Sequence, residues 1–383
     1  MSNTSPFFGF LEVDIEVPED KWEYFGELSP IFVNKEYDES ICGEYTNKVI
    51  KSLDRKPSKS KKLVTILKAE KILIKSTRLR WMLEHGCIVT KLHGVIEAKG
   101  GRVFKDFMNW VSDERRKGDV DQKYAIISEG AKLVGNSAFG VTGMDKNKHR
   151  KVKMCDEIQF NRAKNDYFYY DAEEYDGTYE VVKKSKKVKQ NIPIQIACSV
   201  YDDSKLRMLQ FNYDCIDYFI PREDYQRLEM DTDSSYMALA ADFESLIKPH
   251  LRKEFEENKY KFFPRDDEKF KAFDKRTPGL FKVEFEGDGM IALNSKTYFV
   301  WNEHENKMSA KGVQKGRNSD ILVKEKYLAC LMNNELIIGE NKGFRFIDKS
   351  MKTYELNKTG LSPVYPKGVV MDDGIHIRPI TDF

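Results

Sequence analysis

The sequence predicts an α+β fold built on antiparallel strands, and three observations support this class. Apolar and acidic residues alternate at 11–17, and a similar alternation recurs at 87–98, as in half-buried strands. Helical periodicity covers three longer segments, 103–117, 122–139 and 194–220. Two short apolar segments flank an acidic turn at 231–234, which is typical of a β-hairpin. We find no internal repeat.

The remaining segments are shorter, and turn residues separate them. Strands are expected at 63–67, 72–74, 280–286 and 296–301. Helices are expected at 77–85, 242–257 and 320–333. A hairpin is expected where Asp176-Gly177 separates 167–170 from 179–182. Most of 19–62 is expected to be irregular, and the tail from 344 to 380 is expected to hold short strands broken by proline and glycine.

Composition predicts a folded protein with a partner of opposite charge. The chain has 383 residues, of which 40% are hydrophobic and 33% charged, so it can bury a core in two or three domains. Its net charge is only +2, but residues 48–80 hold twelve Lys and Arg against two acids. Residues 183–189 hold five lysines and no acid. Such local basic patches suit a polyanion, although a solvated basic loop is the alternative for each patch alone.

Cysteine usage and the absence of long apolar segments indicate the cellular setting. The six cysteines are scattered and include no C-x-x-C pair, which favours reduced thiols in an intracellular protein over a disulfide framework or a zinc site. The N-terminal residues lack the order of a signal peptide, and no apolar run is long enough to span a membrane. We therefore expect no membrane partner.

The acidic hairpin has the residues of a metal site. Side chains alternate along a strand, so Asp231 and Asp233 point the same way and Thr232 points opposite. Two carboxylates at that spacing, roughly 6–7 Å between Cα atoms, repel each other unless a cation lies between them. Oxygen-only ligands of high charge suit Mg²⁺. The alternative is a polar hairpin tip, because Asp and Ser are ordinary turn residues.

A second group of residues shares one face of the helix expected at 122–139. Helical spacing places Lys132, Asn136, Phe139 and Gly140 together. A lysine is a point charge suited to triphosphate oxygens, and an aromatic ring beside glycine forms a flat wall for a base or sugar. The alternative is the ordinary end of an amphipathic helix, with an exposed lysine and a glycine cap.

Both stretches together resemble family B DNA polymerases. The helix matches that family's K-x-x-x-N-S-x-Y/F-G pattern, the hairpin matches its D-T-D-S pattern, and their order and separation also agree. Further matches resemble the protein-primed branch found in bacteriophages, adenoviruses, linear plasmids and Polinton (Maverick) transposons. These matches are Phe104-Lys105-Asp106-Phe107 of the fingers, Ser295-Lys296-Thr297-Tyr298 of the K-x-Y primer strand, and Lys311-Gly312 and 369–374 of the thumb. Residues 204–206 and 279–284 are most similar to the Polinton type. The resemblance extends over about residues 8–380.

The resemblance implies a right-hand fold with an antiparallel palm sheet, helical fingers and a small thumb. The palm would comprise 1–37 and 193–301, the fingers 98–140 and the thumb 302–383. By chain position, 38–97 and 141–192 match the two terminal-protein-region insertions of the branch. One of these guides the priming protein and duplex, and the other encircles the template for processivity and strand displacement. Their basic runs suit phosphate contacts, which weaken with salt.

The resemblance also implies a role for each matched residue. Asp233 would be the metal-bridging catalytic carboxylate, with Asp231 beside it as a second catalytic and metal-binding residue. The nucleotide-binding residues would be Lys132, Asn136, Phe139 and Gly140. The primer-binding residues would be Lys296, Tyr298 and Lys311. Lys296 and Tyr298 stand two apart on an expected strand and therefore share a face; exposed strand or loop lysines are the alternative.

The implied reaction is template-directed nucleotidyl transfer from a dNTP to a primer 3′-hydroxyl. Two Mg²⁺ ions are expected, one lowering the pKa of the attacking hydroxyl and one carrying the triphosphate and the leaving pyrophosphate. The implied partners are primer-template DNA, a dNTP and a terminal priming protein. The chain is expected to act as a monomer.

Several departures from the family's pattern bear on activity. The upstream D-x-x-S-L-Y-P motif, which supplies a further carboxylate, is not found, and neither is the exonuclease domain. Glu229 stands where a tyrosine is usual, and Val141 stands where a basic residue is usual. Glu229 shares a strand face with both aspartates, but one strand cannot clamp a metal from two sides. We therefore expect a truncated, catalytically incomplete polymerase, with the second metal site incomplete.

Two alternatives belong to other functional classes. A non-catalytic DNA-binding remnant of a mobile-element polymerase would bind primer-template DNA without Mg²⁺–dNTP. A metal-dependent nuclease would cleave DNA without dNTPs. The helix that carries Lys132 and Gly140 would then have no role, which argues against this alternative. Reverse transcriptases typically carry adjacent aspartates, which this hairpin lacks.

Overall fold

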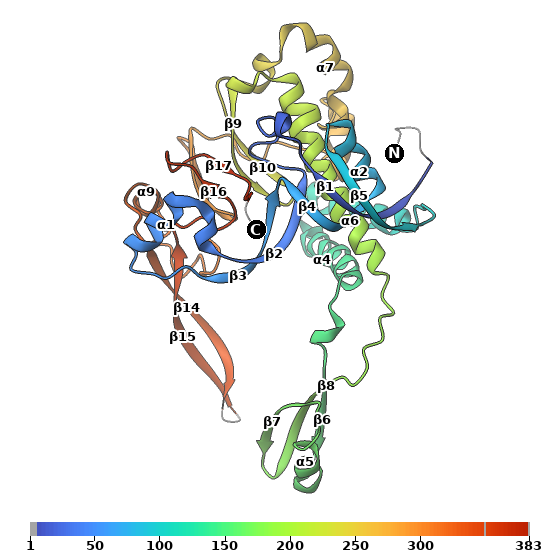
Figure 1. Ribbon diagram of the computed structural model, residues 1–383, viewed down its shortest axis with the longest axis vertical. Coiled ribbons are helices and arrows are strands. Elements are labelled where there is room, and N and C mark those ends of the chain that lie inside the picture. The colour runs from blue at the N-terminus through green and yellow to red at the C-terminus, as the bar shows by residue number, and fades with distance from the viewer. Residues whose placement is uncertain (1–5, 348–349, 382–383) are drawn as a thin grey trace. The chain divides into compact units, whose positions relative to one another are not determined.

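The structure is a computed structural model that describes residues 6–347 and 350–381, and it confirms the mixed α+β class (Figure 1). The chain forms two compact units. Unit 1 comprises Met1–Val103, Asp202–Gly343 and Tyr354–Phe383, and unit 2 comprises Phe104–Tyr201 and Phe344–Thr353. The proposed palm, fingers, insertions and thumb remain predictions. Within the described ranges, no helix combines the length and the apolar composition that crossing a bilayer requires.

The first sheet of unit 1 has the strand order β4-β1-β5. Its strands are β1 (Gly9–Glu16), β4 (Lys68–Lys75) and β5 (Ile88–Glu97), and all pairings are antiparallel. The alternation expected at 11–17 is confirmed, since Leu11, Val13 and Ile15 are buried in the main core. Helix α2 (Ser76–Glu84) follows β4 and contributes buried Trp81 to the same core.

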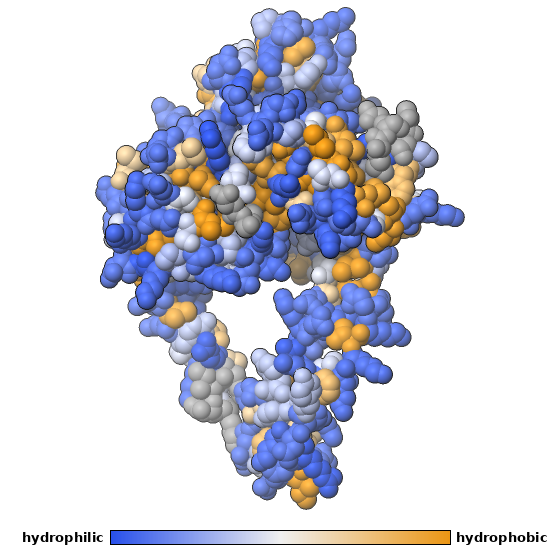
Figure 2. Space-filling model, in the orientation of Figure 1, coloured by the Kyte–Doolittle hydropathy of each residue, from blue (hydrophilic) through white to orange (hydrophobic). Residues whose placement is uncertain are grey.

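Strand β5 forms an edge of this sheet and exposes apolar side chains. Ile88, Leu92, Val95 and Ile96 are each about half exposed. Figure 2 shows hydrophobic side chains gathered over β1 and β5 on the face in view. The register of β1 with β5 shifts twice, and such irregularities hinder the addition of a further strand to an edge.

The expectation that most of 19–62 is irregular was wrong. Strand β2 (Ile31–Asp38) pairs in continuous antiparallel register with β3 (Lys59–Ile66), and helix α1 (Gly43–Ser52) lies between them in sequence. The segment depends on Glu39, which is buried and pairs with Arg55 and Lys62. Sequence periodicity misses such a segment because its central partners are charged and distant in the chain.

Helix α6 (Ile194–Gln210) continues into a π-helix, Phe211–Asp217, and the boundary between the two units falls within α6. The π-helix is buried in a second apolar cluster with Phe219, Tyr225 and Phe255. The acidic hairpin follows as β9 (Tyr225–Asp231) and β10 (Ser234–Leu239), which confirms the predicted strands.

Two expectations between 242 and 286 were wrong. The first part of the expected helix at 242–257 forms two 3-10 turns, and only α7 (Arg252–Asn258) is α-helical, followed by α8 (Glu268–Asp274). Pro249 explains the break, because proline restricts the residue before it and cannot donate a helical hydrogen bond. Residues 280–286 form no strand; Phe281 instead stacks on Phe211, with ring centroids 3.8 Å apart.

The C-terminal part of unit 1 has its own apolar cluster. Its strands are β11 (Gly289–Asn294), β12 (Thr297–Trp301) and β13 (Asn306–Ser309), in that order in one sheet. Helix α9 (Lys324–Asn333) begins four residues later than expected. Short strands were expected in the tail, but most of it forms one long two-stranded ribbon of β14 (Ile337–Ile347) and β15 (Ser350–Leu361) (Figure 1). Two short strands follow and pair with each other, β16 (Val369–Val370) and β17 (Ile377–Arg378).

Unit 2 contains the predicted pair of helices and a small sheet. Helix α3 (Lys105–Val120) packs on α4 (Ala125–Thr142), where Gly118 leaves room for Ser128 and Gly135 for Val111. The sheet has the order β6-β8-β7. Its elements are β6 (Arg150–Cys155), α5 (Glu157–Ala163), β7 (Tyr169–Tyr175) and β8 (Thr178–Lys184). The predicted Asp176-Gly177 turn joins β7 to β8, with positive φ at both residues.

Candidate functional site

The tip of the β9–β10 hairpin is a tight acidic turn. Asp231 pairs with Ser234, and the backbone N–H of Asp233 donates to the carbonyl of Asp231 at 2.6 Å. Thr232 has a φ of +58°, which is strained for a β-branched residue. Thr232 and Asp233 are exposed, whereas Asp231 is partly buried. The turn therefore presents the Asp233 carboxylate to solvent.

The turn between β11 and β12 holds the acidic hairpin through Lys296. The ammonium of Lys296 lies 3.0 Å from Asp231 Oδ1, and its backbone N–H donates to Glu229 Oε1 at 2.9 Å. Lys296 itself has a φ of +66°, so a residue in a sparsely populated conformation makes both contacts. The first carboxylate of the hairpin is thus neutralised by a lysine that is 65 positions later in the sequence.

A second contact joins the same two segments. Tyr236 on β10 donates from its hydroxyl to the hydroxyl of Tyr298 on β12 at 2.6 Å, and the two ring centroids are 4.7 Å apart. Burial and this hydrogen bond raise the pKa of Tyr236, so its proton is retained. Lys311 also lies close, since its backbone N–H is 3.5 Å from Thr297 Oγ1. The predicted catalytic and primer-binding residues therefore all lie in unit 1: Asp231, Asp233, Lys296, Tyr298 and Lys311.

Glu229 is the most perturbed carboxyl near the hairpin. Burial raises its pKa to about 7, and the charge of Asp231 adds to the effect, while the Lys296 N–H and the charge of Lys367 oppose it. Lys367 is also perturbed, because burial and the charge of Lys311 lower its pKa. Lys296 and Lys367 thus place two positive charges near Glu229 and Asp231, and the charge of Lys311 lies near Lys367. No sequence pattern indicates Lys367.

The predicted nucleotide-binding residues occupy the exposed side of α4. Ser128 and Ala131 are buried and Gly135 packs against α3, whereas Lys132, Asn136 and Gly140 are exposed or open. Lys132 has only a distant ion pair, 3.9 Å from Glu129. A Cβ on Gly140 would meet no atom within 4 Å.

Phe139 completes this face of α4. Its ring packs edge to face on Tyr201, with ring centroids 5.3 Å apart. The helix thus brings together the cation, the amide, the aromatic ring and the bare glycine surface that the sequence predicts.

The donor set at the hairpin does not fit a centre for two metal ions. Asp231 and Asp233 supply two carboxylates, but one oxygen of Asp231 is held by Lys296. Across residues 6–347 and 350–381, no group of three or more His, Cys, Asp or Glu side chains is placed to hold a metal ion. Asp14 does not provide the further carboxylate, because it accepts from the backbone N–H of Lys71 and bonds to His93.

Comparisons with protein-family models, curated proteins and solved structures found no match.

Proposed function

We propose that the chain is the polymerase portion of a protein-primed family B DNA polymerase, with a right-hand fold, and that it binds primer-template DNA and a dNTP. One observation carries the proposal. The acidic hairpin and the K-x-Y strand, identified separately in the sequence, are in direct contact through Lys296 and Tyr298. In this proposal the terminal base pair of the primer lies over that contact, and Lys311 binds a primer phosphate.

The exposed face of α4 supports the nucleotide-binding part of the proposal. Lys132 is suited to triphosphate oxygens because its ammonium has only a weak competing partner. Phe139, fixed by Tyr201, supplies a rigid ring for base or sugar contact. The open surface at Gly140 permits close approach of a ligand to the helix backbone.

We also propose that the chain as it stands is catalytically incomplete. Transfer by two Mg²⁺ ions requires carboxylates that clamp the ions from more than one strand. The described residues offer only Asp231 and Asp233 at the hairpin tip, both from one turn. We therefore expect binding of DNA and nucleotide without efficient chemistry.

Equilibrium binding tests the proposed primer contact. Fluorescence anisotropy with a labelled primer-template should show binding that weakens steeply with salt. Lys296→Ala should weaken binding about threefold to tenfold and lower the salt slope by about 1. Lys253→Ala, at an exposed lysine on α7, is the matched control and should change neither. Equal affinities for all three proteins would contradict the proposal.

Primer extension tests the incompleteness. With Mg²⁺ and dNTPs the chain should extend a primer no better than Asp233→Asn. Robust extension that the Asp233→Asn substitution abolishes would contradict the proposal and would point to a carboxylate acting as a substitute for the missing one.

A non-catalytic DNA-binding remnant is the second candidate, and the Lys296–Asp231 ion pair favours it. A hairpin neutralised by a lysine can contact DNA without repelling phosphates. Nucleotide binding distinguishes the two candidates. The polymerase proposal expects dNTP binding that Lys132→Ala weakens, whereas the remnant would bind DNA but no dNTP.

A further inference from the structure

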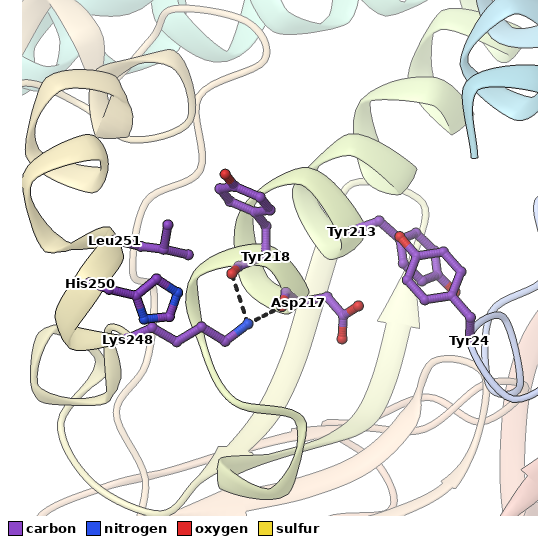
Figure 3. A pocket seen from close by; sticks show the side chains of 7 residues that line it. All are labelled: Tyr24, Tyr213, Asp217, Tyr218, Lys248, His250 and Leu251. Atoms are coloured by element: carbon purple, nitrogen blue, oxygen red, sulfur yellow. Dashed lines mark hydrogen bonds between the residues drawn. The ribbon is translucent and has the colours of Figure 1, made fainter. Parts of the chain in front are cut away.

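A cavity of about 480 Å³ opens in unit 1 at a distance from the acidic turn. It is lined by Tyr24, by Tyr213, Asp217 and Tyr218 of the π-helical segment, and by Lys248, His250 and Leu251 (Figure 3). Tyr225, at the start of β9, donates to Asp217 Oδ1 at 2.5 Å. Because Asp231 is six positions after Tyr225 on β9, the Cα atoms of these two residues are about 20 Å apart. It is therefore separate from the proposed polymerase site.

The π-helix brings three of the lining residues together. Tyr213 and Asp217 belong to the π-helix, and Tyr218 directly follows it. Residues four and five apart are neighbours where i→i+5 bonding applies, and all three side chains line the cavity. A regular α-helix would turn Tyr218 away from Tyr213. Lys248 then fixes the end of this helix, because its ammonium donates to the carbonyls of Asp217 and Tyr218.

The cavity offers flat aromatic surfaces on two sides. Tyr218 is 45% exposed and Tyr24 is 38% exposed, although both project from an otherwise packed region. Tyr24 is supported from behind by Tyr213, with ring centroids 5.0 Å apart. In Figure 3 the Asp217 carboxylate lies between Tyr218 and the Tyr24–Tyr213 pair. A planar ligand can therefore stack on a tyrosine and reach the carboxylate with its edge.

The polar groups in the cavity are complementary in charge and kind. Asp217 Oδ1 accepts from Tyr225, while Oδ2 accepts no hydrogen bond from any described residue. Burial, together with the charges of Asp217 and Asp214, raises the pKa of Tyr24 to about 12, so its hydroxyl remains a donor. At the same helix end the Lys248 ammonium uses two of its three N–H groups on the carbonyls of Asp217 and Tyr218, and exposed His250 stands beside it. The cavity thus offers an acceptor at Asp217 and a positive charge at Lys248.

We propose that this cavity binds a single unpaired nucleotide. The base stacks on Tyr218 or Tyr24, its N–H edge donates to Asp217, and its phosphate meets Lys248 and His250. Guanine is favoured because it presents two adjacent donors, whereas thymine presents one donor between two carbonyls that a carboxylate repels. The nucleotide is either a free mononucleotide or one nucleotide turned out of a strand, and both share this chemistry. The inference stands without the proposed function.

Two simpler ligands use the cavity less well. An organic cation would suit the tyrosine rings and Asp217, but the neighbouring Lys248 ammonium would repel it. A bare phosphate would suit Lys248 but would leave the rings unused and face the Asp217 carboxylate. A nucleotide is the ligand that uses the rings, the carboxylate and the ammonium together.

Calorimetric titration of the whole chain with mononucleotides tests the inference. GMP should bind measurably below about 1 mM and about tenfold more tightly than dTMP. Tyr218→Ala should weaken GMP binding at least about fivefold, because one stacked ring is lost. Asp217→Asn should reduce the preference for GMP over dTMP. The amide oxygen can still accept the hydrogen bond from Tyr225, but the amide N–H₂ group would face the N–H donors of guanine and repel them. Guanosine should bind more weakly than GMP if the phosphate meets Lys248.

Matched controls separate the cavity from folding defects and from the polymerase site. Tyr260→Ala removes another tyrosine of similar exposure, 42%, that also bonds to a carboxylate, and it should leave GMP binding unchanged. Lys253→Ala should also leave it unchanged, whereas the cavity variants should retain primer-template binding. Circular dichroism and melting temperature check that Tyr218→Ala folds.

Single-stranded oligonucleotides distinguish the two sources of the nucleotide. If the site takes a nucleotide from a strand, an oligomer with one central guanine should bind more tightly than GMP and lose that advantage in Tyr218→Ala. If it takes a free nucleotide, GMP should bind more tightly than the oligomer. Absence of saturable GMP and oligomer binding, or binding that is unchanged in both Tyr218→Ala and Asp217→Asn, would overturn the inference.

Discussion

Lys296 neutralises Asp231 from a separate turn, with its ammonium 3.0 Å from the carboxylate, and the backbone N–H of the same residue bonds to Glu229. One residue therefore satisfies two acidic side chains that point from the same strand. The hairpin and the β11–β12 turn are consequently coupled, and changes in either should be felt in the other.

The first prediction concerns the strength of this ion pair. Both side chains are partly exposed, so solvent screens their attraction. A double-mutant cycle with Lys296→Met and Asp231→Asn, followed by urea unfolding, should give a coupling energy of about 0.5 kcal/mol. A coupling near zero would show that the contact is not maintained in solution.

The second prediction uses the titration of Glu229. Its folded pKa of about 7 lies above its ordinary value of 4.5, so the folded state holds the proton more tightly. Stability should therefore be unaffected below the ordinary value and should fall as pH rises from 4.5 towards 7. The effect of Glu229→Gln on the free energy of unfolding should be about 2 kcal/mol more favourable at high pH than at low pH.

Exposed Glu257 on α7 provides the control for that experiment. Glu257→Gln should show the same stability difference at both pH values. A Glu229→Gln effect that is independent of pH would contradict the raised pKa.

The third prediction concerns His85, which stacks on Trp81 with ring centroids 3.8 Å apart. Burial opposes its charge, but hydrogen bonds to the Asp214 carboxylate and the Trp81 carbonyl outweigh burial, and the pKa is raised. The imidazolium should stabilise the fold fully below the ordinary pKa, and this contribution should be lost as pH rises through the raised value. Thermal melting of His85→Gln should therefore show a larger loss near about pH 5 than near about pH 9. An equal loss at both would contradict it.

The fourth prediction concerns the buried pair formed by Arg78 and Asp202. Arg78 is 2% exposed and lies 3.2 Å from Asp202, which also accepts the backbone N–H of Lys75. Arg78→Met should cost about 3–5 kcal/mol, because it removes the guanidinium from a buried carboxylate and leaves only the Lys75 N–H and the more distant Lys205 ammonium beside it. Arg78→Met/Asp202→Asn should cost less than the sum of the two single changes. Lys68→Met, at an exposed lysine, is the control in urea unfolding.

Local pattern predicted much of the fold and singled out the candidate site residues, whose roles stay predictions. The period of two in β1 and the acidic turn after β9 are properties of consecutive residues, so the sequence alone locates them. The same holds for α4, whose helical spacing places Lys132 beside Asn136. Long-range pairing is different in kind. Glu229 lies beside Lys296 and near Lys367, which are far from it in the sequence. The segment that contains β2 has Glu39 paired with Arg55 and Lys62, and no periodicity connects these charged residues.

The cavity at the π-helix also depends on contacts between distant parts of the chain, so local sequence patterns do not predict it. The sequence indicates one continuous helix from 194 to 220, whereas residues 211–217 form a π-helix that packs in one cluster with Phe255 and Phe262. Tyr24 reaches the same place from a loop near the N-terminus. Only the three-dimensional arrangement brings these side chains to one cavity.

Photocrosslinking tests the central claim most directly. A primer whose 3′-terminal base carries a photoreactive group, annealed to a template, should crosslink to peptides that contain Lys296–Tyr298 or the 231–236 turn. A primer with the group at its 5′ end should not. Crosslinks confined to other peptides, with the 3′ group as with the 5′ group, would contradict the claim that the acidic hairpin and the K-x-Y strand together hold a primer terminus.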